Sequence, residues 1–401
     1  MRILQVCNKV PWPPKDGGAI ATLTMSKGFS LLGHDVHILS MNTKKHHITI
    51  DEIPNDLKER MDFHLVDVPA KITSFGLLGN LLFSKRPYNA SRFISGRFSQ
   101  KLVELLQENE FDLIQLEGLY LCPYIPVIRK HSKALIAYRA HNVEHEIWER
   151  TAAVTPGTKR VYLKLLANRI RKFELSHLNN YDVLVPITDR DGELLDRLGN
   201  TKPRHTTQTG IDLATLVPKA GQLEYPSVFH LGALDWAPNQ EGLLWFLVNC
   251  WPKLQQKHPT LKFYVAGRNA PDWLQSRLQY KNVVFLGEIE DAYAFMNSKA
   301  IMVAPLLSGS GMRIKIIEGL ALGKAIVSTT IGAEGIAVEK GKHILLADEP
   351  NELIDGVSKL IDDRDLYDKL CKNAIDFIHD KFDNLAIAES LTDFYKQHLN
   401  A

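Results

Sequence analysis

Short apolar runs alternate with helix-like amphipathic stretches along almost the whole of this chain, in two series separated by a polar segment. The first series predicts strands at residues 2–7, 36–40, 112–117, 134–140 and 183–188. The second predicts strands at residues 228–233, 262–267, 283–287, 300–306, 325–328 and 344–347. Strands that alternate with helices form parallel sheets with helices on both faces. We therefore expect an α/β protein with two doubly wound, Rossmann-like domains.

The length supports two domains, because 401 residues exceed the usual size of one hydrophobic core. Residues 206–226 are polar and show no periodicity, so we assign them to an interdomain linker. This linker separates a domain at residues 1–205 from a second domain at residues 227–380. A helical pattern continues to the end of the chain, so residues 381–401 are expected to form a C-terminal helix.

The composition is that of an ordinary globular protein, with 45% hydrophobic and 23% charged residues. No apolar run reaches about 18 residues and the chain starts with a predicted strand, so we expect neither a membrane-spanning helix nor a signal peptide. The four cysteines lie far apart, without metal-ligand or redox spacing. A reducing cytoplasm fits this cysteine usage, and the net charge of +2 gives no reason to expect a nucleic-acid partner.

The stretch at residues 305–336 has the pattern of a nucleotide-phosphate cradle. A buried strand is followed by a turn of small residues, and then by a helix expected at residues 312–322. Free amide groups and the positive dipole end at a helix N-terminus favour phosphate oxygens, and Arg313 and Lys315 add positive charge there. Gly311, Lys315 and Glu318 fall on one helix face, where Glu318 can accept hydrogen bonds from a sugar diol. The alternative is a plain crossover helix on which Lys315 and Glu318 form a surface pair.

A second pattern of this kind opens the chain. After the first strand and a proline-rich loop, Gly17 and Gly18 begin an amphipathic helix. Paired glycines allow a ligand to approach the backbone closely at a helix N-terminus. The segment is neither Gly-x-Gly-x-x-Gly nor a P-loop with its lysine.

Four segments occur in the order seen in one enzyme family: the Gly17-Gly18 loop, Arg139-Ala140-His141-Asn142, Thr209-Gly210-Ile211-Asp212 and the helix that carries Glu318. In this order and spacing the chain resembles the retaining glycosyltransferases of family 4, the GT-B type group also called group 1. The resemblance spans nearly the whole chain. It implies two Rossmann-like domains that face each other across a cleft, with the last helix crossing back to the first domain.

The resemblance also implies roles for individual residues. His141 would lie near the donor sugar as a catalytic residue, together with Arg313 and Lys315 at the diphosphate. Donor-binding positions implied by the family pattern and the loops at the strand ends are Gly17, Gly18, Gly232, Arg268, Glu288, Ile289, Ser310, Gly311, Met312 and Glu318.

The chain departs from the family pattern at two places. The family usually has Glu followed eight residues later by Glu, and Ser310 stands where the first of these carboxylates is expected. The family also usually carries an Arg and a Lys after the first strand of the second domain, and residues 230–239 contain neither. We hypothesise that Arg313 and Lys315 supply the missing positive charge to the departing diphosphate.

His141, Glu144 and His145 have a spacing that could suggest a metal site, but no further ligands lie nearby in the sequence. We therefore expect no metal and no other cofactor. Without the family resemblance, a lone histidine of this kind is more often a structural hydrogen-bonding group.

The predicted activity is transfer of a sugar from a UDP- or GDP-sugar to an acceptor hydroxyl, with retention at the anomeric carbon. The acceptor would be a carbohydrate or lipid-linked molecule in polysaccharide or glycolipid synthesis. Two related alternatives stay open: a sugar-nucleotide 2-epimerase and a non-catalytic sugar-nucleotide-binding subunit. The second is favoured by Ser310, which stands where the family has a carboxylate. A dinucleotide-dependent oxidoreductase would need the Gly-x-Gly-x-x-Gly fingerprint and an acidic residue after the second strand, where residues 40–42 offer none.

Charge is unevenly distributed, because residues 1–205 carry a net +7 and the remainder a net −5. Much of the excess lies in residues 75–98, where an apolar run meets basic residues, and in residues 159–172, which hold six Lys or Arg. Such segments can rest on an anionic membrane, so peripheral contact at the inner face of the cell membrane is one expectation. A solvated helix face and a packed hydrophobic loop form the alternative.

Overall fold

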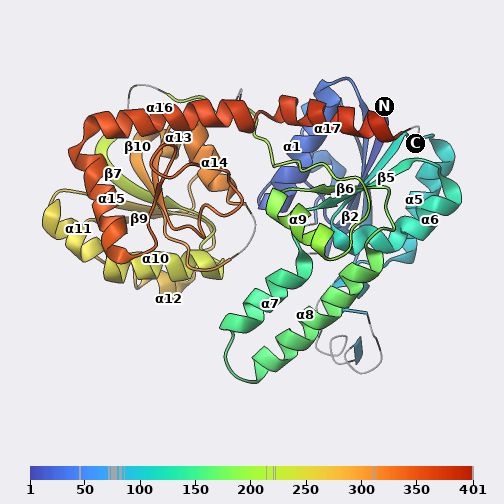
Figure 1. Cartoon of the computed structure of the whole chain (residues 1–401), viewed down its shortest axis with the longest axis horizontal. Helices are drawn as coiled ribbons and strands as arrows, with labels where there is room; N and C mark the ends of the chain where they lie inside the picture. The colour runs from blue at the N-terminus through green and yellow to red at the C-terminus, as the bar shows by residue number, and fades with distance from the viewer. Residues whose placement is uncertain are drawn as a thin grey trace. The chain divides into compact units, whose positions relative to one another are not determined.

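The computed structural model describes residues 1–44, 47–70, 73, 79–80, 84, 86–213, 215–219, 221, 223–309 and 312–399. The chain divides into two compact units (Figure 1). The first consists of Met1–Gly210 and Asn384–Ala401, and the second of Ile211–Asp383. The division after Gly210 falls inside the segment that was assigned to a linker.

The first unit contains a six-stranded parallel sheet in the order β3-β2-β1-β4-β5-β6. All of its strands except the edge strand β3 are largely buried, as expected where helices cover both faces. The register places Cys7 beside Ser40 and Glu117 beside both Cys7 and Arg139, so the carboxyl ends of the central strands lie together. The strands are β1 (Arg2–Cys7), β2 (Asp35–Thr43), β3 (Asp62–Val68), β4 (Leu113–Glu117), β5 (Leu135–Ala140) and β6 (Val183–Pro186).

Helices cover both faces of this sheet, and each face has its own hydrophobic core. One core includes side chains of α5, α6 and α8, and the other includes side chains of α1 and α17. In Figure 1, α7 and α8 form an antiparallel hairpin that projects from the sheet of this unit. The helices are α1 (Gly17–Leu31), η2 (Ile50–Glu52), α2 (Asn55–Lys58), α4 (Tyr88–Ser91), α5 (Gly96–Glu108), η3 (Leu119–Tyr124), α6 (Ile125–His131), α7 (Glu144–Val154), α8 (Thr158–His177), α9 (Asp189–Arg197) and α17 (Asn384–His398).

The last helix, α17, is part of the first unit and packs on α1. A Cβ at Gly28 would lie 2.6 Å from the Cβ of Ala388, so only glycine allows the two helices to come this close. The Tyr395 side chain is fully buried, and its hydroxyl donates to Gln115 of β4 at 2.6 Å. The core beneath α1 is therefore completed by residues from the far end of the sequence.

The second unit has its own six-stranded parallel sheet, in the order β12-β11-β10-β7-β8-β9. Its strands are β7 (Glu224–Leu231), β8 (Phe263–Ala266), β9 (Val283–Gly287), β10 (Lys299–Ala304), β11 (Ala325–Ser328) and β12 (Leu345–Leu346). Its helices are α10 (Ala237–Asn249), α11 (Trp251–Lys257), α12 (Asp272–Gln275), α13 (Ala292–Ser298), α14 (Ile314–Ala321), α15 (Pro350–Asp362) and α16 (Arg364–Lys381).

The prediction of two doubly wound parallel sheets is confirmed. Strands β1, β9 and β11 have the predicted bounds, whereas β3 was not predicted. The helix expected at 312–322 is shorter, because α14 begins at Ile314 and Arg313 is its N-cap. Among the described residues, no helix combines the length and the apolar character needed to cross a membrane.

Candidate active site

His141 follows the carboxyl end of β5 and points at a carboxylate on the neighbouring strand. Its Nε2 lies 2.6 Å from Oε2 of Glu117, the last residue of β4. The His141 side chain is only 15% exposed and that of Glu117 only 3%. A carboxylate in this position fixes both the orientation of the ring and the nitrogen that carries the proton.

Four further side chains hold Glu117. Its Oε1 accepts hydrogen bonds from Gln5 at 3.2 Å and from Gln115 at 2.5 Å, and its Oε2 accepts one from Thr22 at 3.2 Å. The fully buried Arg139 lies 3.4 Å from Oε2. Burial by itself raises the pKa of Glu117, but Arg139 and His141 outweigh it, so the pKa is about 2. Glu117 is therefore an ionised, fully held group behind His141.

Gly17 and Gly18 open α1, whose N-cap is Asp16. The Asp16 carboxylate accepts a hydrogen bond from the Ala19 amide at 3.0 Å and pairs with Lys9. Gly17 is exposed and a Cβ there would meet nothing within 4 Å, whereas a Cβ at Gly18 would lie 3.3 Å from the Lys9 ammonium group. The structure thus leaves the backbone of Gly17 open to approach.

His141, Glu144 and His145 do not converge on one point. His145 Nδ1 lies 2.5 Å from Glu174 of α8, and Glu144 accepts a hydrogen bond from the Tyr120 hydroxyl at 2.8 Å. The Glu174 carboxylate also accepts hydrogen bonds from the Glu144 and His145 amides, and so closes the N-terminus of α7. Burial raises the pKa of Glu144 to about 7, with Glu174 adding to the shift and the Tyr120 hydrogen bond opposing it.

In the second unit, Arg313 lies against an aromatic ring where the loop after β10 enters α14. The guanidinium carbon of Arg313 is 5.3 Å from the centre of the Trp236 ring, and Arg313 is only 9% exposed. Gly309 has φ +111°, and a Cβ there would lie 2.9 Å from Arg313 and 3.2 Å from Trp236. Glycine is therefore required at this position for both conformation and space.

Glu318 is buried on α14 and is engaged by two neighbours. Its Oε1 accepts a hydrogen bond from Tyr293 of α13 at 3.0 Å, and its Oε2 lies 2.6 Å from the Lys315 ammonium group. Lys315 and Glu318 thus form an ion pair within α14, as expected if α14 is a plain crossover helix and not a phosphate-binding one. Burial raises the pKa of Tyr293, and the adjacent Glu318 raises it further, so Tyr293 is a hydrogen-bond donor here.

The remaining donor-binding candidates lie in loops at the carboxyl ends of the strands, except Ser310 and Gly311, which are outside the described residues. A Cβ at Gly232 would lie 2.6 Å from the Asn239 side chain, so this glycine is needed for packing. The Arg268 carbonyl accepts a hydrogen bond from the Leu234 amide at 2.9 Å. Glu288 is exposed, and Ile289 and Met312 are partly exposed.

Three of the side chains in these networks were not among the predicted site residues: Glu117, Trp236 and Tyr293. The position of Glu117 at a strand end was visible in the sequence, and its pairing with His141 follows from the adjacency of β4 and β5. No sequence spacing connects Trp236 with Arg313 or Tyr293 with Glu318, because each pair joins separate elements.

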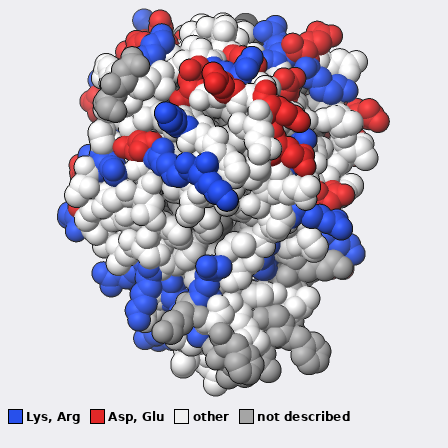
Figure 2. All heavy atoms as spheres, turned by 90° about the vertical axis from the view of Figure 1, so that its right-hand side faces the viewer, with Lys and Arg blue, Asp and Glu red and all other residues white. Residues whose placement is uncertain are grey.

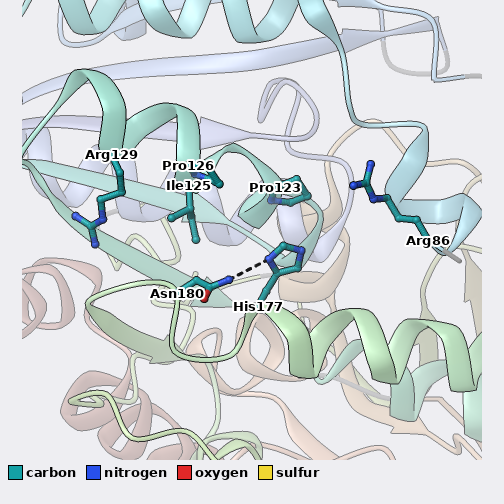
Figure 3. Close-up of a pocket in the computed structure, with 7 residues that line it drawn as sticks. All are labelled: Arg86, Pro123, Ile125, Pro126, Arg129, His177 and Asn180. Atoms are coloured by element: carbon teal, nitrogen blue, oxygen red, sulfur yellow. Dashed lines mark hydrogen bonds between the residues drawn. The ribbon is translucent and has the colours of Figure 1, made fainter.

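Two other features of the first unit lie away from these residues. A pocket of about 460 Å³ lies between α6 and the end of α8, where Arg86, Arg129, His177 and Asn180 line it with three apolar residues (Figure 3). Arg129 is already paired with Asp182 at 2.5 Å. The pocket contains none of the predicted site residues.

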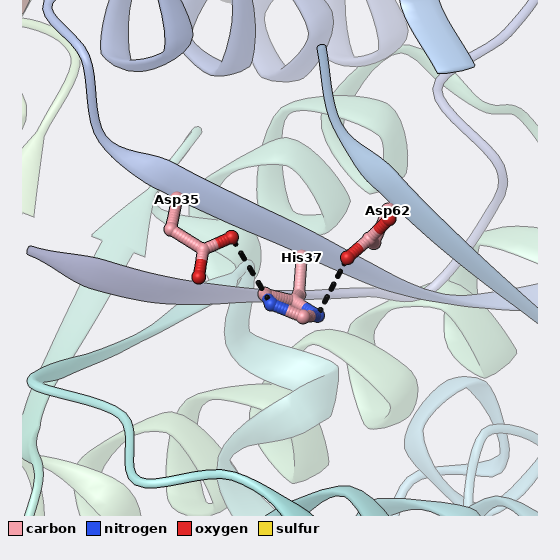
Figure 4. A group of neighbouring side chains, drawn as sticks. All are labelled: Asp35, His37 and Asp62. Atoms are coloured by element: carbon pink, nitrogen blue, oxygen red, sulfur yellow. Dashed lines mark ion pairs between the residues drawn. The ribbon is translucent and has the colours of Figure 1, made fainter. Parts of the chain in front are cut away.

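The second feature is a group of side chains that could hold a cation: Asp35, His37 and Asp62 (Figure 4). The two carboxylates lie 3.3 Å and 3.6 Å from the two ring nitrogens of His37, and Arg2 pairs with Asp35 at 2.6 Å. The group lies at the amino ends of β2 and β3, whereas His141 follows the carboxyl end of β5. We assign it no part in the chemistry of His141.

Comparison with known proteins finds a family similarity in the second unit. Residues 225–363 match the family described as Glycosyl transferases group 1. The chain is 21% identical to an uncharacterized 44.6 kDa protein in the cps region of Klebsiella pneumoniae, over 97% of this chain and 98% of that protein. It is 26% identical to a phosphatidyl-myo-inositol mannosyltransferase of Mycobacterium tuberculosis, over 35% of this chain and 39% of that protein.

Solved structures share the fold over the full length. Sucrose-phosphate synthase from Thermosynechococcus elongatus aligns with a TM-score of 0.75 and 14% identity, covering 100% of both chains. Anabaena Alr3699/HepE in complex with UDP-glucose aligns with a TM-score of 0.69 and 14% identity, covering 99% of this chain and 100% of that one. The chain therefore has the GT-B fold of these structures, and residues 225–363 are similar to the group 1 glycosyl transferases.

Proposed function

We propose that this protein transfers a glycosyl group from a nucleoside-diphosphate sugar to an acceptor hydroxyl. The observation that carries the proposal is the group 1 glycosyltransferase domain at residues 225–363, which includes the buried Arg313 beside Trp236. A guanidinium at the entry to a helix is suited to bind phosphate oxygens. The GT-B fold of the whole chain supports the same class of activity.

The donor is a UDP- or GDP-sugar in this proposal. UDP is favoured by the similarity in fold to a protein solved with UDP-glucose. Because part of the chain is similar to mannosyltransferases, GDP and other nucleotides are also included in the binding experiment below. Arg313 and the amides after Gly309 bind the diphosphate. Glu318 binds the ribose, which requires that it exchange its bond to Lys315 or Tyr293 for bonds to the sugar diol.

In the proposed reaction, the bond between the anomeric carbon and the diphosphate oxygen breaks while the acceptor oxygen bonds to the same carbon from the same face. The acceptor proton passes to the departing diphosphate. Because the new bond forms on the face from which the diphosphate leaves, the configuration at the anomeric carbon is retained. Arg313, with Lys315 as the second cation, stabilises the negative charge that develops on the leaving group. His141, oriented by Glu117, is the proposed catalytic residue at the donor sugar.

The proposed acceptor is a carbohydrate or a lipid-linked sugar, in the synthesis of a polysaccharide or glycolipid. A cytoplasmic location is part of the proposal. It is supported by Cys7, Cys122, Cys250 and Cys371, which are all free thiols, three of them buried.

Thermal unfolding with UDP, GDP, ADP and CMP tests the donor site. A ligand at 100 times its dissociation constant adds about 2.7 kcal/mol of stability, so a binding nucleotide raises the melting temperature measurably. We expect one diphosphate to stabilise the wild type and to stabilise Arg313→Gln much less. The corresponding sugar nucleotides are then assayed for transfer. If no nucleotide raises the melting temperature, the proposal is wrong.

A non-catalytic sugar-nucleotide-binding role is the second candidate, because Glu318 is already in an ion pair with Lys315 and accepts a hydrogen bond from Tyr293. Nucleotide binding without turnover on any acceptor would favour it. Release of a new sugar nucleotide in the absence of an acceptor would instead indicate a 2-epimerase.

A further inference from the structure

Helix α8 has two faces of different character, and only one is used by the fold. Its buried residues are Leu163, Leu166, Ala167, Ile170, Phe173 and Glu174, which face the rest of the first unit. Leu166, Ile170 and Phe173 are part of the core under α6. One side of α8 therefore fixes the hairpin of α7 and α8 to its unit. The packing of the unit does not account for the residues on the other side.

Apolar residues continue on the outward side of α8. Val161 is 71% exposed, Leu165 is 42% exposed and Leu175 is 37% exposed. Together with Asn168 and Lys172 they recur at intervals of four, three, four and three residues, so they form one stripe along the helix. This stripe lies opposite the buried residues. Three exposed aliphatic side chains on one helical stripe are more than the scattered single residues of an ordinary surface.

Positive charge lies beside this stripe and within it, because Arg160, Lys164 and Arg171 flank one side of it and Lys172 belongs to it. Lys159, Arg160, Lys164, Arg171 and Lys172 are all exposed, and none forms an ion pair within the described part of the chain. The only acidic residue of α8 is Glu174, which is 2% exposed and bonded to His145. Among the residues drawn in colour in Figure 2, the lower part of this face shows Lys and Arg but no Asp or Glu.

We propose that the outward face of α8 rests on a membrane that contains anionic lipids, with Val161 and Leu165 entering the boundary between headgroups and acyl chains. Helices that lie in this interface combine an apolar strip with flanking Lys and Arg, as α8 does. At about 1.5 Å per residue, the 20 residues of α8 extend about 30 Å along such a surface. A protein partner would need complementary acidic groups in one fixed pattern, whereas an anionic lipid surface matches any arrangement of cations.

The proposal goes beyond glycosyl transfer and is tested without donor or acceptor. The full-length protein is sedimented with vesicles of phosphatidylcholine alone and with vesicles that also contain phosphatidylglycerol. We expect binding only to the anionic vesicles, and weaker binding as salt screens the charges. Equal binding to both kinds of vesicle, or binding to neither, would overturn the proposal.

A pair of double variants tests whether the surface that binds vesicles is the outward face of α8. Arg171→Glu/Lys172→Glu should bind anionic vesicles at least roughly tenfold more weakly than the wild type, because each basic residue contributes severalfold to such binding. Lys369→Glu/Lys372→Glu makes the same change in charge at exposed positions of α16 and should bind as the wild type does. Equal losses in the two double variants would show that only net charge matters, against the assignment to α8.

The apolar contribution is tested by Val161→Ser/Leu165→Ser, with Val248→Ser as the control, because Val248 of α10 is 61% exposed on the second unit. We expect weaker vesicle binding for the first variant alone, with melting temperatures near that of the wild type for both. If Val161→Ser/Leu165→Ser instead abolishes self-association and leaves vesicle binding intact, the stripe binds a second copy of this chain and the lipid assignment is wrong.

Discussion

The hydroxyl of Tyr395 donates a hydrogen bond to Oε1 of Gln115 at 2.6 Å, although 280 residues separate the two in the sequence. The amide nitrogen of Gln115 in turn donates to Glu117, and Glu117 bonds to His141. A continuous hydrogen-bonded path therefore runs from the last helix of the chain to the candidate catalytic histidine. The groups along this path are buried up to His141 itself. A substitution at any of them should therefore alter the orientation of the His141 ring.

We expect Tyr395→Phe to lower stability by about 1 kcal/mol, the usual net contribution of one hydrogen bond, and also to lower the rate of transfer. Tyr225→Phe removes a comparable bond in the second unit, from its hydroxyl to the Leu360 carbonyl at 2.6 Å. That control should lose similar stability and keep its rate. Chemical denaturation and transfer assays measure the two effects, and equal rates for both variants would exclude a coupling to His141.

Glu117→Gln should destabilise the protein by about 3–5 kcal/mol, because it leaves the buried Arg139 without its carboxylate. It should also reduce kcat by at least roughly tenfold, since a tenfold change needs only about 1.4 kcal/mol. Glu174→Gln is the matched control, because Glu174 is also buried and bonded to a histidine, His145. Measured where both variants remain folded, a loss of kcat in Glu117→Gln alone supports the role of His141.

Arg313→Gln should weaken binding of the nucleoside diphosphate by roughly tenfold to a hundredfold, since a hydrogen bond to a charged group contributes about 1.5–3 kcal/mol. Arg277→Gln tests whether loss of any Arg–Trp stack has this effect, because Arg277 lies 5.8 Å from the Trp273 ring in the same unit. Isothermal titration gives both affinities. Unchanged affinity in Arg313→Gln would remove Arg313 from the donor site.

Glu117 and Glu144 should make stability depend on pH in opposite directions. The pKa of Glu117 falls on folding, from an ordinary value of 4.5 to about 2, so its stabilisation is present above the ordinary value and is lost as the pH drops toward 2. The pKa of Glu144 rises from 4.5 to about 7, so its stabilisation is present at low pH and is lost as the pH rises through 7.

Melting temperatures across this range separate the two carboxyl groups. Glu144→Gln cannot ionise, so we expect it to lose part of the decline in stability that the wild type shows between its ordinary pKa and about pH 7. Its stability at acidic pH should still fall, because Glu117 remains. A wild type and a Glu144→Gln variant with parallel pH profiles would contradict the raised pKa.

Gly17→Ala should leave stability almost unchanged, because an added Cβ meets nothing within 4 Å. If a donor group approaches this backbone, the same methyl group should raise KM or lower kcat. Gly96→Ala is the control, since Gly96 also opens a helix and has the same free space. Transfer kinetics of the two variants, compared at equal melting temperatures, decide whether Gly17 belongs to the site.

The sequence predicted the sheets well because their strands are continuous apolar runs between turns. It missed β3, in which Asp62, His64 and Asp67 interrupt the apolar residues at the edge of the sheet. His141 and Arg313 were proposed from motifs along the chain, whereas the partners that orient them come from other strands and loops. Such pairings depend on strand order and on packing, which single-chain spacing does not encode.

Because α17 supplies Ala388, Leu391 and Tyr395 to the core of the first unit, that unit cannot be completed during synthesis until the ribosome has released residues near 398. The second unit, Ile211–Asp383, is contiguous and is made before α17. Although it comes later in the chain, it can therefore finish folding first. Nascent chains halted before residue 384 should hold a folded second unit and a first unit whose α1 face is still exposed to chaperones.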